Sequence, residues 1–276
     1  MSELSDKDIA QQLRAQHKEQ EVKKTNFPTE IVELPSKGLL YPEGHPLSSG
    51  KIEMKYMTAR EEDILTSANL IKQGVVLDML LKSLIVTPVK YEDILNGDKN
   101  AIMVAARVLG YGKDYEASIT CPSCGHVNNV TIDLTQITNK HFEESLVTPG
   151  LNEFEYELPT SKRLVKFKVL THGDEKLIEQ SVKAYKKLNK RSGVDPTLTT
   201  RLSHIITSVD GNADKKTIKD FIDNELFAVD SRALRKYIAA VSPDIDMTFS
   251  FECEECGHTN DETAIPMGVG FFWPRA

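Results

Sequence analysis

Two cysteine motifs decide how this chain folds: Cys121-Pro-Ser-Cys124-Gly-His126 and Cys253-Glu-Glu-Cys256-Gly-His258. Each motif lies between two strand-like runs, which is typical of a zinc knuckle, a tight hairpin in which both thiolates point the same way. The glycine after each pair gives the backbone the freedom that such a turn needs. One knuckle offers two ligands and a structural zinc site needs four. The sequence therefore predicts one zinc ion per chain, shared by Cys121, Cys124, Cys253 and Cys256.

The sequence of the four cysteines also allows other chemistries. Disulfides are one alternative, although thiols stay reduced in a cytoplasm. A redox pair is another, but Cys121-Pro-Ser-Cys124 lacks the strand-to-helix setting of a thioredoxin-like motif. We expect His126 and His258 to lie beside the site rather than to bind the ion. A site with four protein ligands has no open position for water or substrate, so we expect a structural and not a catalytic zinc.

The segments that precede the two motifs also correspond, which predicts an internal duplication. Asp98 lies 23 residues before Cys121, and Asp230 lies the same distance before Cys253. Four pairs of segments share order and character: LPSK (34–37) with LPTSK (158–162), MKYMTAREE (54–62) with FKVLTHGDE (167–175), LLKSLI (80–85) with RLSHII (201–206), and CPSCGH with CEECGH. The alternative is that two α+β segments of ordinary composition look alike by chance.

The local patterns predict an α+β fold. In the first half, residues 51–57 read as a strand, Thr58 and Glu61 form a capping box, and helices follow over 61–71, 75–85 and from Asp98 to Gly110. We expect two duplicated halves, each made of a strand, helices and a zinc-knuckle hairpin, joined by a discontinuous zinc ribbon. The boundaries are a polar N-terminal arm (1–27), a first repeat (28–145), a second repeat (146–266) and an aromatic C-terminal tail (267–276).

Composition and charge exclude several classes of protein. The formal net charge is −7 and the pI is near 5.6, which argues against a general binder of nucleic acid or of anionic membranes. No stretch reaches the 18 or so apolar residues that span a bilayer, and the start of the sequence lacks the apolar centre of a signal peptide. We therefore expect a protein made and kept in a cytoplasm, with no membrane partner.

Signatures of catalysis are weak, so we expect neither an enzyme nor a small-molecule substrate. Gly110-Tyr-Gly-Lys113 lacks the full phosphate-loop pattern, and the sequence has no H-E-x-x-H or G-x-S-x-G. One basic cluster could face an acidic partner or a nucleic-acid backbone, but it is more typical of a solvated helix face. It consists of Lys183, Lys186, Lys187, Lys190 and Arg191.

The end of the sequence is unusually aromatic. Phe271, Phe272 and Trp273, which is the only tryptophan, lie within the last six residues. Chain ends are usually polar and frayed. These rings either pack into the core or anchor in a pocket of another protein, where aromatic residues are favoured contacts. We assign them as candidate partner-binding residues.

Taken together, ELPSKGLLYP (33–42), MTAREEDIL (57–65), the two C-x-x-C-G-H knuckles and FFWP (271–274) resemble the baseplate hub subunits and hub assembly proteins of T4-like phages. The similarity covers nearly all of the chain after about residue 28. It implies a structural or assembly role in the baseplate hub of a contractile tail, with other hub or tail proteins as partners. It also implies a location in the virion tail baseplate, after assembly in the host cytoplasm. A zinc-ribbon regulator that binds nucleic acid is the alternative, which the acidic pI disfavours.

Overall fold

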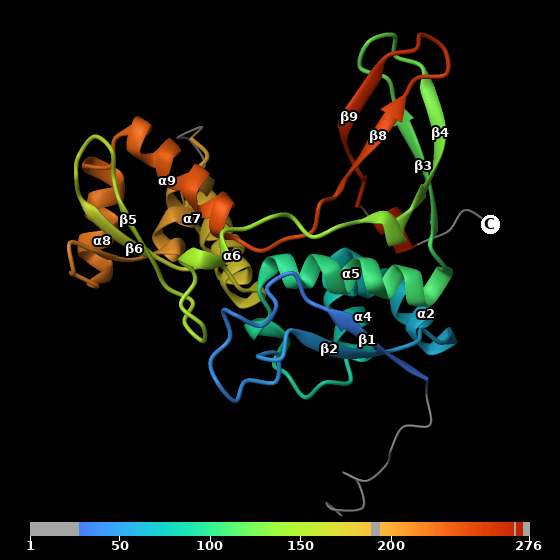
Figure 1. The fold of residues 1–276 in the computed structure, drawn as a ribbon, viewed down its shortest axis with the longest axis horizontal. Coiled ribbons are helices and arrows are strands. Elements are labelled where there is room, and N and C mark those ends of the chain that lie inside the picture. Colours follow the sequence, from blue (N-terminus) through green and yellow to red (C-terminus); the bar gives the residue numbers. More distant parts are fainter. Residues whose placement is uncertain (1–27, 189–193, 268, 273–276) are drawn as a thin grey trace, which may run out of the picture.

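The computed structural model describes residues 28–188, 194–267 and 269–272. It has three parts: two α+β bodies that lie side by side and an arm of paired hairpins that stands above the helix α5 of the first body (Figure 1). We use the term arm only for the paired hairpins. The N-terminal segment that was predicted to be a polar arm, residues 1–27, lies outside the described residues. The mixture of helices and small antiparallel sheets confirms the α+β class.

The first body begins with a two-stranded antiparallel sheet and continues with helices. Its elements are β1 (Thr29–Glu33), β2 (Lys51–Lys55), α2 (Ala59–Thr66), α3 (Ala68–Gln73), α4 (Val76–Leu84), η1 (Tyr91–Asp93) and α5 (Asn96–Tyr111). The helix expected over 61–71 is broken at Ser67, whose extended backbone ends α2 and begins α3. The helix expected from Asp98 starts two residues earlier, which places Asp98 in its first turn.

The second body carries a three-stranded antiparallel sheet in the order β5-β6-β7 and four helices among the described residues. Its elements are β5 (Phe154–Glu157), β6 (Leu164–Phe167), α6 (His172–Leu188), α7 (Thr197–Ile205), β7 (Ile206–Val209), α8 (Lys215–Asn224) and α9 (Ala228–Val241). The strand β7 has a counterpart in the first body. Ile206 of β7 pairs with Phe167 of β6, and in the first body Ile85 forms an isolated bridge with Met54 of β2.

The arm is built by hairpins from both halves of the chain. β3 (Asp114–Thr120) pairs with β4 (Val127–Asp133), and β8 (Thr248–Glu252) pairs with β9 (Thr259–Ala264). The short 3-10 turns η2 (Leu134–Gln136) and η3 (Glu144–Leu146) follow β4 on the way to the second body. That outgoing segment runs antiparallel to the returning one, since Asn139 bridges Ile245 and the Lys140 N–H donates to the Asp244 carbonyl at 2.8 Å.

Each body is closed by an aspartate at the start of its last helix. Asp98 accepts hydrogen bonds from the Ser36 N–H at 3.0 Å, the Ser36 hydroxyl at 2.7 Å and the Tyr41 hydroxyl at 2.7 Å. Asp230 accepts from the N–H groups of Thr160 and Ser161, at 2.8 and 2.9 Å. Both aspartates are fully buried. The two L-P-S/T loops are thus held by the same contact in both halves.

The loop residue after each of these serines repeats as well. Lys37 and Lys162 have φ values of 51° and 58°, in the left-handed region that non-glycine residues seldom adopt. A lysine in this conformation is strained, and the neighbouring bonds to Asp98 and Asp230 hold the turn in place.

A second repeated contact fixes the strand-to-helix turn of each body. Glu61 accepts from the Thr58 N–H at 3.0 Å and from Lys55 Nζ at 2.8 Å. Asp174 accepts from the Thr171 N–H at 3.1 Å and from Lys168 Nζ at 2.8 Å. These carboxylates cap the helix amides that have no intrahelical partner.

The two bodies meet through backbone and side-chain contacts. The His172 N–H donates to the Ile94 carbonyl at 2.8 Å, and the Asn96 N–H donates to the Leu170 carbonyl at 3.1 Å. Asp78 lies 3.1 Å from His172 Nε2 and 2.9 Å from Lys176 Nζ. These contacts fix the first turn of α6 against the first body.

We predict that replacing Asp98 by Ala lowers the free energy of unfolding by about 3 kcal/mol, because buried donors of Ser36 and Tyr41 lose their acceptor. Urea unfolding followed by circular dichroism measures the loss. Asp63→Ala, an exposed aspartate of the same body, is the control and should change stability by less than about 0.5 kcal/mol. Equal effects of the two variants would contradict this role of Asp98.

Acid should weaken the turn held by Glu61. Burial alone raises the pKa of this carboxyl, yet hydrogen bonds from Lys55, Thr58 and Ser83 lower its pKa to about 2. The folded-state pKa lies below the unfolded value of about 4.3, so the stabilisation is complete above that pH and is lost as pH falls toward 2. The stability difference between the native chain and Glu61→Gln should therefore shrink between pH 5 and pH 2. A difference independent of pH would contradict the assignment.

Candidate metal centre

The four cysteines meet at the far end of the arm. Cys121 and Cys124 lie in the turn between β3 and β4, and Cys253 and Cys256 lie in the turn between β8 and β9. Cys121 and Cys253 are buried, whereas Cys124 and Cys256 are exposed. The four sulfur atoms all lie within 4.8 Å of one another. The structure thus brings together two motifs that are 132 positions apart in the sequence.

Two of the sulfur–sulfur distances fit a tetrahedral tetrathiolate site. Cys121 Sγ lies 3.7 Å from Cys256 Sγ, and Cys124 Sγ lies 3.7 Å from Cys253 Sγ. Zinc–sulfur bonds of about 2.3 Å in a regular tetrahedron place the sulfur atoms about 3.8 Å apart. All four cysteines are free thiols. The closely spaced pairs join one hairpin to the other, which is the arrangement needed for one ion between two knuckles.

Local backbone geometry explains why each turn presents two thiols. The Cys121 N–H donates to the His126 carbonyl, and the Gly125 N–H donates back to the Cys121 carbonyl. Cys253, His258 and Gly257 make the same pair of bonds in the second turn. Gly125 and Gly257 have φ values of 77° and 66°, which a side chain would strain.

Asn128 joins the two turns beside the sulfur atoms. Its side chain is 1% exposed, its Oδ1 accepts from the Glu254 N–H at 2.9 Å, and its Nδ2 lies 3.6 Å from Cys253 Sγ. The sequence motifs gave no sign of this residue, because it lies outside the C-x-x-C pattern. A buried amide that donates toward a thiolate orients the ligand and stabilises its charge.

The cysteines differ in their tendency to ionise. Burial opposes ionisation of Cys253, but N–H groups of Cys256 and Glu255 and the Asn128 amide lower its pKa to about 6. For Cys124, the His126 N–H acts to lower the pKa, whereas burial and the other three thiols raise it to about 12. Cys253 therefore ionises readily. A second thiolate beside it is repelled by the first negative charge, and a bound cation would remove this repulsion.

The apolar interior of the arm has two parts. Beside the thiols, Cys121, Phe251 and Cys253 form a small cluster, with Ile119, Val130 and Phe249 packed against them. Toward the base of the arm, Ala117, Ile132 and Ile265 belong to the core that the arm shares with the two bodies. The thiol cluster is therefore the main candidate for holding the far ends of the two hairpins together.

The remaining candidate residues lie elsewhere. The His126 side chain is exposed and that of His258 is partly exposed, and their backbone carbonyls, not their rings, support the turns. Lys183, Lys186 and Lys187 lie on exposed turns of α6, while Lys190 and Arg191 lie outside the described residues. The described lysines of this basic cluster thus lie on α6 of the second body and not on the hairpins that carry the thiols.

The aromatic tail corrects one assignment. Phe271 and Phe272 are each 1% exposed and belong to the core of this chain, in the short helix η4 (Val269–Phe272). Phe271 packs edge to face against Tyr115 at the base of the arm, with ring centroids 4.9 Å apart. Burial of these large rings in their own chain makes them unavailable as anchors in a partner. Trp273 lies outside the described residues.

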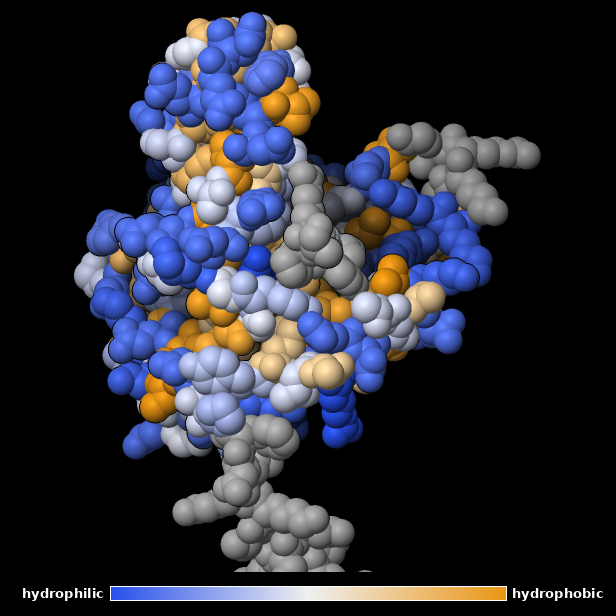
Figure 2. Space-filling view, turned by 90° about the vertical axis from the view of Figure 1, so that its right-hand side faces the viewer, coloured by the Kyte–Doolittle hydropathy of each residue, from blue (hydrophilic) through white to orange (hydrophobic). Residues whose placement is uncertain are grey.

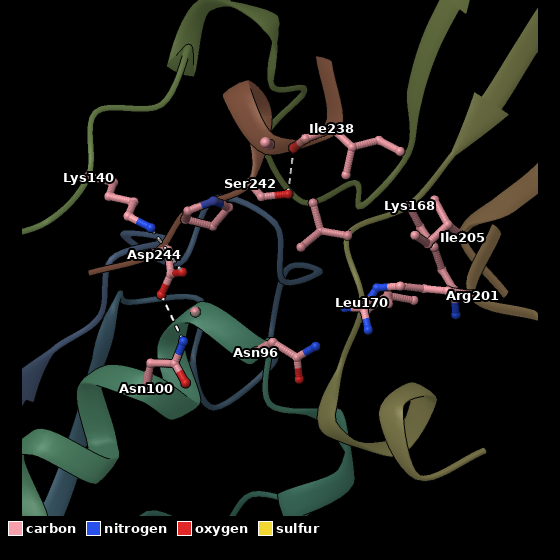
Figure 3. Close-up of a pocket in the computed structure, with 14 residues that line it drawn as sticks. Asn96, Asn100, Lys140, Lys168, Leu170, Arg201, Ile205, Ile238, Ser242 and Asp244 are labelled. Carbon is pink, nitrogen blue, oxygen red and sulfur yellow. Dashed lines mark hydrogen bonds and ion pairs between the residues drawn. The ribbon is translucent and has the colours of Figure 1, made fainter. Parts of the chain in front are cut away.

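A cavity of about 240 Å³ lies where the two bodies meet (Figure 3). Asn100 Nδ2 donates to Asp244 at 2.9 Å, and Lys140 Nζ lies 3.7 Å from the same carboxylate. Lys168 pairs with Asp174, and Arg201 pairs with Glu175. The charged groups around the cavity form ion pairs with one another. The cavity is therefore best described as a gap in the polar contact between the two bodies.

These features define a two-bodied α+β protein with a candidate tetrathiolate centre at the end of a projecting arm. Among the described helices, none combines the length and apolar character needed to cross a bilayer. A family model described as T4 bacteriophage base plate protein matches residues 28–273. The chain therefore belongs to this family of phage baseplate proteins. No curated protein and no solved structure matches it significantly.

The geometry predicts that the reduced chain binds one cobalt(II) ion with the absorption of a tetrahedral thiolate complex. Cobalt(II) accepts the same geometry as zinc and, unlike zinc, gives a visible spectrum. Cys253→Ser should weaken binding strongly and shift the spectrum, because one of four sulfur ligands is lost. His126→Ala is the control and should leave the spectrum unchanged. An unchanged cobalt spectrum in Cys253→Ser would show that the two turns do not share the ion.

Proposed function

We propose that this chain is a non-enzymatic structural or assembly component of the baseplate hub of a contractile phage tail, stabilised by one zinc ion. The observation that carries the proposal is the family match over residues 28–273, which includes both bodies and the arm. Baseplate membership implies contacts with other tail or baseplate proteins and a place in the virion tail. The hub is the part of the baseplate to which the sequence motifs point.

The scaffold role is supported by how the polar groups of the chain are used. Buried Asp98, Asp230 and Glu61 are occupied by hydrogen bonds from loops and helix starts. The cavity between the bodies is lined by charges that neutralise one another. Buried polar groups in these contacts specify and rigidify the fold.

The metal is proposed to be zinc with a structural role. Four cysteine ligands leave no coordination position for water or substrate, so the ion would supply stability rather than chemistry. Thiolates are soft ligands that favour zinc over magnesium or calcium. Cys121, Cys124, Cys253 and Cys256 would hold it, and Asn128 would orient Cys253.

We also infer that the two halves arose by duplication. The repeated aspartate contacts, the repeated left-handed lysines and the paired knuckles support this inference. It assigns residues 28–145 and 146–266 to the two repeats. The zinc ion would then join equivalent ends of the two repeats.

Nucleic-acid binding at the metal centre is disfavoured by charge. The arm, defined as residues 113–134 and 248–265, contains one Lys, no Arg and eight Asp or Glu. A surface of this sign repels a phosphate backbone. A regulator that binds nucleic acid through this zinc ribbon would need basic side chains at the same place.

Native purification from phage-infected cells tests the proposal. We expect one zinc per chain and co-purification of other baseplate hub proteins, identified by mass spectrometry. Cys253→Ser should lose zinc and give fewer assembled tails, since the arm loses its cross-link. The exposed variant Asp63→Ala is the control and should assemble normally. Zinc together with nucleic acid or polymerase subunits, without tail proteins, would contradict the hub role.

A further inference from the structure

A groove of about 340 Å³ lies at the base of the arm, where the end of β4 and the start of β8 come together. Three consecutive residues of β4, Thr131 to Asp133, and three of β8, Thr248 to Ser250, line it. Consecutive side chains of a strand point to opposite faces of its sheet, so a groove on one face would be lined by every second residue. A groove lined by three consecutive residues of each strand lies instead at the edges of these strands. Within the described residues, β4 pairs only with β3 and β8 only with β9. The groove is therefore flanked by two strand edges with unused backbone hydrogen-bonding groups.

The floor of this groove is apolar. Ile132 and Ile265 are 6% and 5% exposed, and Phe249 is partly buried and packs against the cluster of Cys121, Phe251 and Cys253. An apolar side chain that entered from outside would find these three contacts. Exposed strand edges beside an apolar floor are the features that bind an extended peptide by strand addition.

One carboxylate, Asp133, lines the groove, and two others lie next to residues that line it. The hydroxyl of Thr248 donates to Asp246 at 2.7 Å, and the hydroxyl of Ser250 donates to Asp261 at 2.8 Å. Neither aspartate has a cationic partner among the described residues, whereas Asp133 is paired with Lys113 at 2.8 Å. Two negative charges next to the groove are thus available to a ligand.

The whole arm has the same sign. The chain has 34 basic and 41 acidic residues. The arm contains one of the basic residues and eight of the acidic residues, so the rest of the chain has 33 of each kind. The formal net charge of −7 therefore lies entirely on this lobe, and Figure 2 shows hydrophilic residues over most of its visible face. Such a field attracts basic surfaces and accelerates their association.

We propose that the groove between β4 and β8 binds an extended segment of another baseplate protein in which lysine or arginine alternates with apolar residues. The backbone of that segment would pair with a strand edge, its apolar side chains would cover Ile132 and Phe249, and its cations would face Asp246 and Asp261. The identity of the partner as a baseplate protein rests on the proposed function. The chemistry of the groove stands on its own residues.

The test uses a labelled seven-residue peptide in which lysine alternates with valine or isoleucine, added to the full chain with its native metal. A peptide of the same composition, with all lysines in one block, is the matched probe. Fluorescence anisotropy should show that the alternating peptide binds at least tenfold more tightly, and that added salt weakens it. Amide shifts in NMR spectra should be largest at residues 131–133 and 248–250.

Two variants locate the site. Asp246→Asn with Asp261→Asn should weaken binding of the alternating peptide about tenfold, because two charge pairs with the peptide lysines are lost. Thr131→Tyr fills the groove without a change of charge and should also weaken it. The control, Glu43→Gln with Asp63→Asn, removes two exposed acidic groups from the first body and should have no effect.

Equal binding of the two peptides, equal loss in the control variant, or no binding of either peptide would overturn the proposal. Equal binding would mean that general charge attraction is sufficient. These outcomes concern only the groove, because the peptides are synthetic and no other tail protein is present. Co-purification of hub proteins tests the proposed function separately.

Discussion

The arm depends on the closeness of four sulfur atoms that come from two distant parts of the chain. With all four inside 4.8 Å, several thiolates cannot coexist without a positive ion between them. The apolar cluster beneath them consists of Phe251 and two of the cysteines, so hydrophobic burial does little to hold the far ends of the two hairpins together. A bound divalent cation would remove the repulsion and link the hairpins at once, and this is the physical reason for assigning the cluster a structural role.

The same link has consequences for the whole chain. An ion shared by Cys124 and Cys253 closes a loop that contains the complete second body. The segments that enter and leave this body already run side by side at Asn139 and Ile245, so the ion adds a second closure to an existing one. In each body, a buried aspartate on the last helix, Asp98 or Asp230, also accepts hydrogen bonds from an L-P-S/T loop and fixes that loop to the helix. Each body therefore has polar contacts of its own that do not involve the arm, while the base of the arm shares one apolar core with both bodies.

Patterns with strict local chemistry predicted a large part of this architecture. The C-x-x-C-G-H motifs predicted two hairpin turns, and Thr58 with Glu61 predicted the start of a helix; the structure contains these features. The strand around residues 51–57 is also present, as β2. These features depend on residues within a few positions of one another, so sequence spacing is enough to identify them.

Features that depend on tertiary packing were harder to predict. The buried amide of Asn128 supports Cys253 from the opposite hairpin, and no local pattern marks it. The sequence left both core packing and partner binding open for Phe271, which was a candidate partner-binding residue. The base of the arm offers Tyr115 and α5 as packing surfaces within the same chain. The groove arises only where the end of β4 and the start of β8 come together, which neither hairpin sequence specifies alone.

X-ray absorption at the zinc edge, on the natively purified chain, tests the central claim most directly. A single ion shared by both hairpins predicts four sulfur scatterers at about 2.3 Å and no nitrogen or oxygen ligand. A first shell with two sulfur atoms and lighter ligands would mean that each hairpin binds metal on its own. That result would contradict the shared centre on which the structure of the arm depends.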